Sequence, residues 1–387
     1  MSLSLNECRS QFASLGSGFA YFDSPGGTQT PDRVRTAIAD ALQSASGNTG
    51  APYATSTRIG DLVSAARLTA AGFLGGTPNE IIFGGSMTSL NFMLSRVVGR
   101  TLEAGDEILV TRLDHDANVA PWLELACERN LVVRTVDIND DTTLNYDDLR
   151  RQLTSRTRIV AFPLASNAIG TTVNGSEVSR IAHDAGALSW ADAVQFAPHA
   201  PIDVRSLGVD VLLCSAYKFC GPHLGIAYVR ASLLDSWTPI NARPAAAYEH
   251  GRRFERGTLP FESLAGLIAA VEYLRSLGGL EAIAAWEEQL GRRLLLALPE
   301  AARVVGMPTT SGRVPTFLVT FPGISAHRMS EQLGGRGFGV WSGEAFYALG
   351  LHDRLRWGEA LRIGLIHYNT EDEVDRLATC LEELVRQ

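Results

Sequence analysis

A lysine stands between two apolar segments in the stretch SAYKFCGPHLGIAYV, which covers residues 215–229. The segments on either side, residues 209–214 and 225–229, have the composition of buried β-strands. An isolated charge is costly to bury, so this lysine has to be paired, kept neutral or bonded to another group. Lys218 is therefore a candidate for covalent chemistry; the ordinary alternative is a side chain that extends from a strand end into solvent.

Polar side chains also follow the other strand-like segments of the chain. In chain order they are Asp114, His115 and Asp116, then Ser166 and Asn167, then Asp192 and Gln195, and finally Ser215 and Tyr217. Ligands of open α/β sheets bind at the carboxyl ends of the strands. We therefore expect these side chains to converge on one site, with Asp116 either capping a helix or serving as a second base.

A glycine-containing turn precedes this set. The strand-like residues 81–83 run into the sequence GGSMT at residues 84–88 and then into a helical pattern. Backbone N–H groups at such a turn and helix start point at one spot and bind phosphate. Gly85, Ser86 and Met87 are thus the predicted phosphate site.

These groups together are the ones that pyridoxal 5′-phosphate (PLP) requires. Lys218 would bond to the cofactor aldehyde, and Asp192 would keep the pyridine nitrogen protonated so that the ring accepts electrons. His115 would stack on the ring. Asn167 and Gln195 would hold its phenolic oxygen. The sequence therefore predicts a PLP site built on Lys218.

The elements that position these residues alternate between helices and strands from about residue 60. The strand candidates are residues 107–111, 132–136, 158–162, 188–190, 211–213 and 226–229. Most are apolar throughout, which is typical of parallel strands buried on both faces. Helical stretches with a 3.6-residue period lie between them, such as residues 176–185. The pattern predicts an α/β fold with a mostly parallel sheet.

This alternation breaks between residues 230 and 257, which contain many Pro, Ala and Gly residues. A long helical pattern follows from residue 263 to about 277, then a strand candidate at 316–320 and a final amphipathic helix at 371–385. We expect a large domain over residues 20–262 and a small α+β domain made of residues 1–19 and 263–387.

Composition and charge argue against several classes of function. With 34 Lys and Arg against 42 Asp and Glu, the chain offers no basic face to a polyanion, so we expect no nucleic-acid partner. No apolar run is long enough to span a bilayer, and the first ten residues lack the features of a secretory leader, so we expect a cytoplasmic location and no membrane partner. Five scattered cysteines without a C-x-x-C pair predict free thiols and no metal site.

Four motifs carry a resemblance to a known family. They read DHDA at residues 114–117, SNAIGT at 166–171, DAVQ at 192–195 and SAYK at 215–218. With them the chain resembles the class V aminotransferase superfamily of PLP enzymes, and most closely its cysteine desulfurase and selenocysteine lyase branch. The resemblance implies PLP-dependent transferase fold type I, with a mostly parallel seven-stranded sheet in the large domain.

The resemblance also implies further site residues. Arg362, in the segment LRIGLIHYNT, would bind the carboxylate of an amino-acid substrate, with Asn167 beside it. Thr258, in RFERGT, would reach the phosphate bound by the other subunit, which implies a homodimer with a shared active site. Tyr217 replaces the family's phosphate-binding histidine, and its hydroxyl can still donate to phosphate.

One departure decides the expected activity. Desulfurases of this branch carry a mobile cysteine in an R-x-G-x-x-C segment, which takes sulfur as a persulfide; here the segment reads WSGEAF, with Phe346 at the cysteine position. We therefore expect β-elimination from cysteine or an S-substituted cysteine, a C–S lyase reaction without a persulfide relay. Transamination, epimerisation and a non-catalytic PLP-binding role are the alternatives.

Three aromatic residues accompany this departure, namely Trp341, Phe346 and Tyr347. The sequence does not fix where they lie in space. If they line the pocket, we expect them to favour a substrate with an apolar tail.

Overall fold

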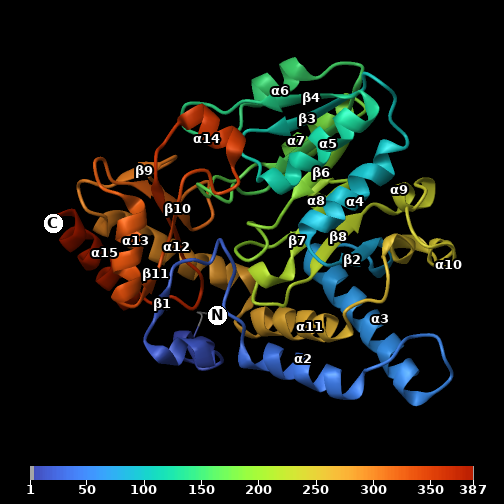
Figure 1. The fold of residues 1–387 in the computed structure, drawn as a ribbon, viewed down its shortest axis with the longest axis horizontal. Helices are drawn as coiled ribbons and strands as arrows, with labels where there is room; N and C mark the ends of the chain where they lie inside the picture. The colour runs from blue at the N-terminus through green and yellow to red at the C-terminus, as the bar shows by residue number, and fades with distance from the viewer. Residues whose placement is uncertain (1–3, 387) are drawn as a thin grey trace.

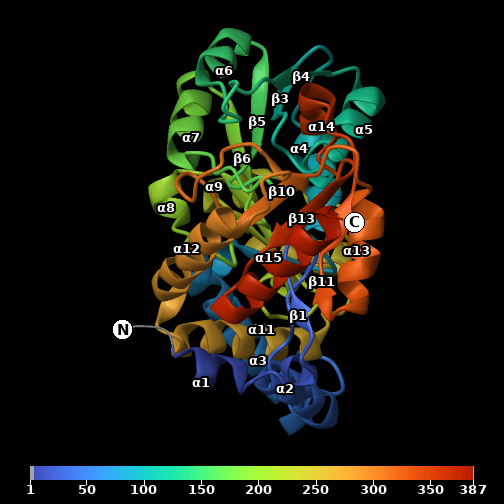
Figure 2. The same cartoon turned by 90° about the vertical axis from the view of Figure 1, so that its left-hand side faces the viewer.

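The structure, a computed structural model, describes residues 4–386 and has two parts. In Figure 1 the larger part, at the right, holds a twisted sheet with helices around it, and the smaller part, at the left in orange and red, holds the C-terminal strands and helices. Figure 2 shows the molecule from the side of the smaller part. Residues 1–3 and 387, which belong to the predicted small domain, lie outside the described residues.

Seven strands form the central sheet, in the order β2-β8-β7-β6-β5-β3-β4. Their bounds are β2 (Ile81–Gly84), β3 (Glu107–Thr111), β4 (Val132–Val136), β5 (Thr157–Pro163), β6 (Leu188–Asp192), β7 (Val211–Ser215) and β8 (Gly225–Val229). β8 pairs antiparallel with both of its neighbours, and all the other pairs are parallel. The predicted α/β class and the mostly parallel seven-stranded sheet are confirmed.

Strand β4 departs from the expectation that the strands are buried on both faces. It lies at the edge of the sheet and pairs only with β3. Val132 is 40% exposed, and only Val136 of this strand is buried. The polar residues Arg134 and Thr135 fit this edge position, because an edge strand keeps one side in water.

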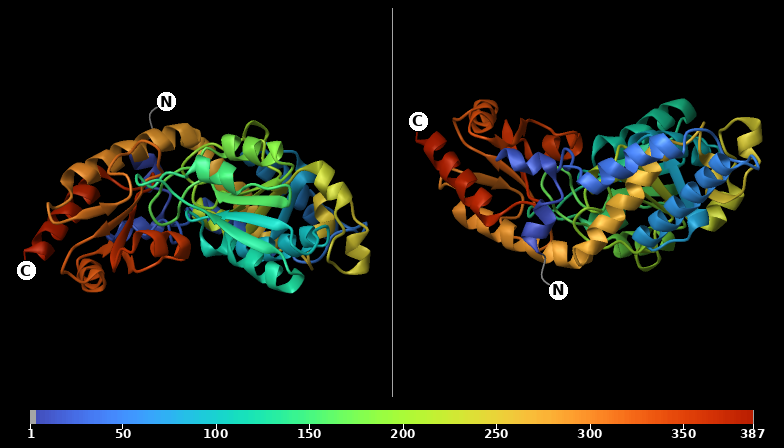
Figure 3. Two further views of the ribbon diagram at one scale, coloured as in Figure 1. Left: turned by 90° about the horizontal axis from the view of Figure 1, so that it is seen from above. Right: turned by 90° about the horizontal axis from the view of Figure 1, so that it is seen from below.

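Helices cover both faces of the sheet, as Figure 3 shows. On one face α4 (Met87–Gly99) and α5 (Ala120–Arg129) share a core with the sheet residue Trp190, whose ring meets that of Trp122 edge-on at 4.9 Å. The other face is covered by α3 (Ala54–Leu74), α7 (Gly175–Asp184) and α11 (Phe261–Ser276). Alternate residues of each strand point into these two cores, as the period of two requires.

The remaining helices of the larger part and of the N-terminal segment are shorter or lie outside these two layers. They are α1 (Leu5–Arg9), α2 (Asp32–Ser44), α6 (Tyr146–Gln152), α8 (Val204–Leu207), α9 (Ala231–Ser236), α10 (Arg243–Ala246) and the 3-10 turns η1 (Ala13–Ser17), η2 (Pro78–Glu80), η3 (Asp116–Asn118), η4 (Ala216–Lys218) and η5 (His250–Phe254). Within residues 4–386, no helix combines the length and apolar character that crossing a bilayer requires.

The smaller part is a four-stranded antiparallel sheet with helices packed against it. Its strand order is β12-β13-β10-β9. The elements are β9 (Arg303–Val305), β10 (Thr316–Thr320), β12 (Trp341–Gly343), β13 (Ala360–Gly364), α12 (Gly279–Ala297), α13 (Ala326–Gly335) and α15 (Glu371–Val385). Helix α14 (Leu349–Leu355) follows β12 in the chain but lies against the larger part, near β3 and β4 in Figure 1, where Arg354 pairs with Asp137 at 3.3 Å. Phe317, Leu361 and Leu381 lie in its core.

Two segments pass between the parts. β1 (Ala20–Tyr21) pairs in parallel with β11 (Phe338–Gly339), so the first residues of the predicted large domain lie beside the smaller part. Conversely, α11 begins at the predicted boundary but packs along α2 and α3, below the large sheet in Figure 1. The boundaries at residues 20 and 263 depend on how these two segments are assigned, and they stay predictions.

The strand ends bring the predicted site residues together. Asp192 is the last residue of β6 and Ser215 the last of β7, while the loops after β3 and β5 carry His115 and Asn167. These four strands are parallel, so their carboxyl ends meet at one edge of the sheet. Arg362 of β13 reaches the same place from the smaller part.

Candidate active site

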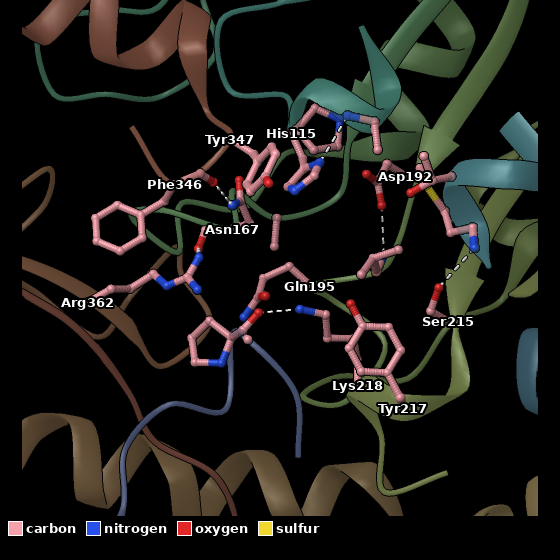
Figure 4. A pocket seen from close by; sticks show the side chains of 18 of the residues that line it. His115, Asn167, Asp192, Gln195, Ser215, Tyr217, Lys218, Phe346, Tyr347 and Arg362 are labelled. Carbon is pink, nitrogen blue, oxygen red and sulfur yellow. Dashed lines mark hydrogen bonds between the residues drawn. The ribbon is translucent and has the colours of Figure 1, made fainter. Parts of the chain in front are cut away.

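Nine of the twelve predicted site residues line one cavity of about 230 Å³ to which both parts contribute. The nine are Met87, His115, Asn167, Asp192, Gln195, Ser215, Tyr217, Lys218 and Arg362. Gly85, Ser86 and Thr258 do not line it. Figure 4 shows Lys218 and Asp192 at one side of the cavity and Arg362 at the other.

Lys218 lies in η4, directly after β7, and only 8% of it is exposed. Its Nζ donates to the backbone carbonyl of Pro25 and lies 5.0 Å from the centre of the Tyr217 ring. Burial and the charge of Arg362 lower the pKa of Lys218 to about 7, although the charge of Asp192 opposes them. A large fraction of this amine is therefore neutral at pH 7, as a nucleophile or a base has to be.

Asp192 is buried, with 5% of its surface exposed. Its Oδ1 accepts a hydrogen bond of 2.8 Å from the Val194 N–H. Burial raises the pKa of Asp192 to about 6, while that hydrogen bond and the charge of Lys218 act in the opposite direction. A carboxylate with this pKa can share a proton with a basic ring nitrogen.

His115 presents a neutral ring to the cavity. Its Nδ1 accepts a hydrogen bond of 3.0 Å from the Ala117 N–H, so the ring proton lies on Nε2. Burial and the charges of Lys218 and Arg362 lower the pKa of His115 to about 4. The ring can therefore stack on an aromatic group and can donate a hydrogen bond from Nε2.

Asp114 and Asp116 shape the loop around His115. Asp114 accepts hydrogen bonds of 2.8 Å from the Thr111 N–H and from the Asn118 amide. Burial raises the pKa of Asp114 to about 8. The capping role considered for Asp116 is wrong, because the side chain that caps η3 is that of His115.

Arg362 has 6% of its surface exposed. Its Nη1 donates to the backbone carbonyl of Asn167 at 3.2 Å, and its Nε has no partner among the described residues. Burial lowers the pKa of Arg362 to about 10, with the charge of Asp23 opposing it, so the guanidinium stays charged near neutral pH. Its free N–H groups suit a carboxylate.

The start of α4 forms the predicted phosphate site only in part. The Met87 N–H donates to Ser215 Oγ at 3.1 Å beside the cavity. Ser86 caps the helix instead of lining the cavity: its Oγ accepts from the Ser89 N–H and its own N–H donates to Ser89 Oγ. Gly85 lies exposed at the turn. The phosphate roles of Gly85 and Ser86 stay predictions.

Thr258 lies outside the cavity. It is exposed in the loop between η5 and α11, where it lines a separate pocket with Asn48 and Asn241. A single chain therefore does not bring Thr258 to Lys218, and its predicted role requires a second copy of the chain.

The two amides predicted to hold the phenolic oxygen already have protein partners. Asn167 Nδ2 donates to the backbone carbonyl of Phe346 at 2.7 Å, and Gln195 Nε2 donates to Thr316 Oγ1 at 3.0 Å. Each amide nitrogen keeps a second hydrogen for a ligand. The Oδ1 of Asn167 is buried without a partner among the described residues.

Position 346 holds no thiol, and neither does the rest of the cavity wall. All five cysteines lie within the described residues, and none of them lines this cavity. Cys220, two residues after Lys218, is fully buried, and burial raises the pKa of its thiol. A buried thiol with a raised pKa is a poor nucleophile.

Two further features of the sequence indicate this site, and neither depends on the four family motifs. Thr88, the second residue of α4, lines the cavity; a hydroxyl two residues after a Gly-Gly-Ser turn at a helix start was the signal for it. The second signal is composition, because Lys218 is the only lysine of the chain and the remaining 33 of the 34 Lys and Arg residues are arginines.

The polar groups of this cavity fit PLP. The N-terminus of α4, with the hydroxyls of Thr88 and Ser215, suits a phosphate. Buried Asp192 suits a protonated ring nitrogen, and Lys218 is an amine with a lowered pKa. The unpartnered Oδ1 of Asn167 further indicates that the cavity is built for a polar ligand.

Replacing Lys218 by Met should change how the stability of the cofactor-free protein depends on pH. The pKa of Lys218 is about 7 in the folded chain against an ordinary 10.5, so unfolding takes up a proton between these pH values and the free energy of unfolding rises with pH. Lys218→Met lacks this term. We expect the free energy of unfolding of Lys218→Met, relative to that of the unmodified chain, to fall by about 2 kcal/mol between pH 7 and pH 9.

Urea unfolding of both cofactor-free proteins at pH 7, 8 and 9 measures this difference. Groups that titrate in this range and do not feel the charge of Lys218 contribute equally in the two proteins, so their contributions cancel. Asp192 and His115 do feel that charge, but their pKa values of about 6 and about 4 lie below this range. A difference that stays constant from pH 7 to pH 9 would contradict the lowered pKa of Lys218.

Comparison with known proteins agrees with this geometry. A model of the aminotransferase class-V family matches residues 20–377. A cysteine desulfurase of an Enterobacter species is 30% identical, with 99% of each chain covered.

Two solved structures of cysteine desulfurases also superimpose on this chain. The apo cysteine desulfurase of Thermococcus onnurineus superimposes with a TM-score of 0.94 at 25% identity, covering 100% of this chain and 99% of that chain. The cysteine desulfurase CsdA of Escherichia coli gives 0.91 at 25% identity with the same coverage. The chain therefore belongs to the aminotransferase class-V family and resembles its cysteine desulfurases over nearly its whole length.

Proposed function

We propose that this protein is a PLP-dependent C–S lyase that acts on cysteine or an S-substituted cysteine without a persulfide relay. The observation that carries the proposal is the composition of the cavity wall. Lys218, Asp192 and Arg362 line it together, whereas none of the five cysteines, all within the described residues, does so. A base and a carboxylate-binding group are thus present, and the thiol that receives sulfur in a desulfurase is missing.

Binding depends on the cationic side chain of Arg362, and proton removal depends on the neutral amine of Lys218. Arg362 binds the substrate carboxylate through its free N–H groups. Lys218 Nζ takes the proton from Cα, for which an amine with a pKa of about 7 is suited. PLP, when bound, supplies an electron sink for the pair left at Cα, and Asp192 holds the proton on its ring nitrogen.

The departing sulfur needs a proton. The Cβ–S bond breaks with both electrons on sulfur, and we assign to it the proton that Lys218 Nζ took from Cα. His115 is neutral and donates a hydrogen bond from its Nε2–H to the departing sulfur, because its Nδ1 accepts from the Ala117 N–H. Water then converts the three-carbon fragment to pyruvate and ammonia. The reaction has no net oxidation, so no further reactant is required.

We further propose that the enzyme is a homodimer with a shared active site. The position of Thr258 supports this: it lies in an exposed loop, away from the cavity of its own chain. Its hydroxyl is able to complete a phosphate site only in another copy.

The lyase is tested with PLP-loaded protein, L-cysteine and a panel of S-substituted L-cysteines. We expect pyruvate and free thiol in a 1:1 ratio, because one Cβ–S cleavage releases both. Lys218→Met should lose this activity by at least about 1,000-fold, since both covalent attachment and Cα deprotonation depend on the amine. A variant with Cys220 replaced by Ser should keep it, because its thiol lies outside the cavity.

Other products would contradict the lyase. A 2-oxo acid that keeps its sulfur would indicate transamination, and a D-amino acid would indicate epimerisation. The absence of any product and of any amino-acid binding would favour a non-catalytic PLP-binding role.

The shared site is tested with Thr258→Ala, with Thr379→Ala on exposed α15 as the matched control. Loss of one hydrogen bond to phosphate should weaken PLP binding about 10-fold or more, and the control should leave it unchanged. A mixed dimer of Lys218→Met and Thr258→Ala chains should then contain one site of full PLP affinity. If Thr258 acted within its own chain, the mixed dimer would contain none. A monomeric mass by light scattering would also contradict the proposal.

A further inference from the structure

One side of the cavity is aromatic. Trp341 comes from β12, and Phe346 and Tyr347 come from the loop between β12 and α14; all three line the cavity, and we call them the aromatic wall. Figure 4 shows Phe346 beside Arg362 and Tyr347 beside His115. The Tyr347 and His115 rings stack at 5.3 Å and 17°.

The aromatic wall surrounds the group that binds the carboxylate. The Arg362 guanidinium lies 4.8 Å from the centre of the Phe346 ring and 5.7 Å from that of Trp341. Trp341 is also the cross-strand partner of Arg362 in the β12–β13 pair. A ligand carboxylate on Arg362 therefore brings the ligand's Cβ, two bonds away, close to these rings.

The loop that carries the aromatic wall is held in place. Asn167 Nδ2 donates to the Phe346 carbonyl and the Asp116 N–H to the Tyr347 carbonyl, both at 2.7 Å. Phe346 and Tyr347 have φ values of 49° and 59°, a conformation that costs energy in non-glycine residues and needs such support. The wall is thus formed before any ligand binds.

The wall keeps apolar surface in water. Trp341 is 52% exposed and Tyr347 is 70% exposed. Gly26 leaves space for the Trp341 ring, because a Cβ there would lie 2.6 Å from Trp341 Cζ3. A substituent that covers these rings gains free energy in proportion to the apolar area removed from water.

We propose that the aromatic wall selects amino acids with a bulky apolar group, preferentially an aromatic one, on the atom attached to Cβ. This inference rests on the proposed function and names its substrate class: cysteines whose sulfur carries an aryl or large alkyl substituent. The reaction that supplies such a substrate is one that joins an apolar carbon group to a cysteine thiol.

Two amino acids that cannot eliminate test the wall apart from catalysis. L-Homophenylalanine has the shape of S-phenylcysteine, and L-norvaline that of S-methylcysteine, with carbon in place of sulfur. Calorimetric titration of the PLP-loaded protein should give L-homophenylalanine about 20-fold tighter binding than L-norvaline, from the apolar area that a phenyl ring adds.

The variants Trp341→Ala and Phe346→Ala should reduce this ratio below about fivefold, because each removes one ring of the wall. Phe346→Leu, which keeps an apolar side chain, should retain more of the ratio than Phe346→Ala. Leu349→Ala is the matched control: Leu349 begins α14 directly after this loop, is 51% exposed and does not line the cavity. It should leave the ratio unchanged.

Several outcomes overturn the inference. They are a ratio near one in the unmodified protein, failure of both ligands to bind, and equal effects of Leu349→Ala and Phe346→Ala. If Trp341→Ala converted the dimer to a monomer and left the ratio of the two ligand affinities unchanged, the Trp341 ring would belong to a contact between subunits instead. Failure of the proposed function is distinct, since it would appear as selective binding without formation of pyruvate from S-phenylcysteine.

Discussion

The burial of one amine is the constraint on which the rest of the site depends. Lys218 is almost completely enclosed at the end of β7, where its Nζ donates to the Pro25 carbonyl. Asp192 and Arg362 act on its charge in opposite directions, and burial decides the balance in favour of the neutral amine. The parallel strands are needed to bring Asp192 to Lys218, and the smaller part is needed to bring Arg362. Cofactor chemistry and substrate binding therefore depend on how the two parts meet.

The contact between the two parts also involves the position at which this chain differs from the cysteine desulfurases. Phe346 stands where the resemblance places the mobile cysteine of the desulfurases. Its carbonyl accepts a hydrogen bond from the Asn167 side chain of the larger part. The segment is thus held against the larger part, and it contains no cysteine. Under the proposed function, the absence of a thiol and the presence of the aromatic wall both suit the release of an intact thiol.

Local pattern and motif context predicted much of the fold and of the site. The apolar strands and the polar residues after them sufficed for Lys218, Asp192 and His115, because these residues follow the carboxyl ends of strands. The edge position of β4 depends on which strands find a second neighbour, and its sequence alone does not specify this. The hydrogen bond from Asn167 to the Phe346 carbonyl joins residues 179 positions apart in the chain, so no local sequence pattern indicates it. Thr258 depends on a second chain.

The central claim is that Lys218 carries the cofactor, and the composition of the chain makes it directly measurable. Borohydride reduction of the PLP-loaded protein, followed by mass spectrometry of the intact chain and its peptides, should give one PLP adduct per chain. Lys218 is the only lysine of the chain and the α-amino group is the other amine that PLP can modify, so the adduct is expected on the peptide that contains Lys218 and not on the N-terminal peptide. Lys218→Met should give no adduct under the same conditions. Absence of an adduct in the unmodified protein, or an equal adduct in the variant, would contradict the account.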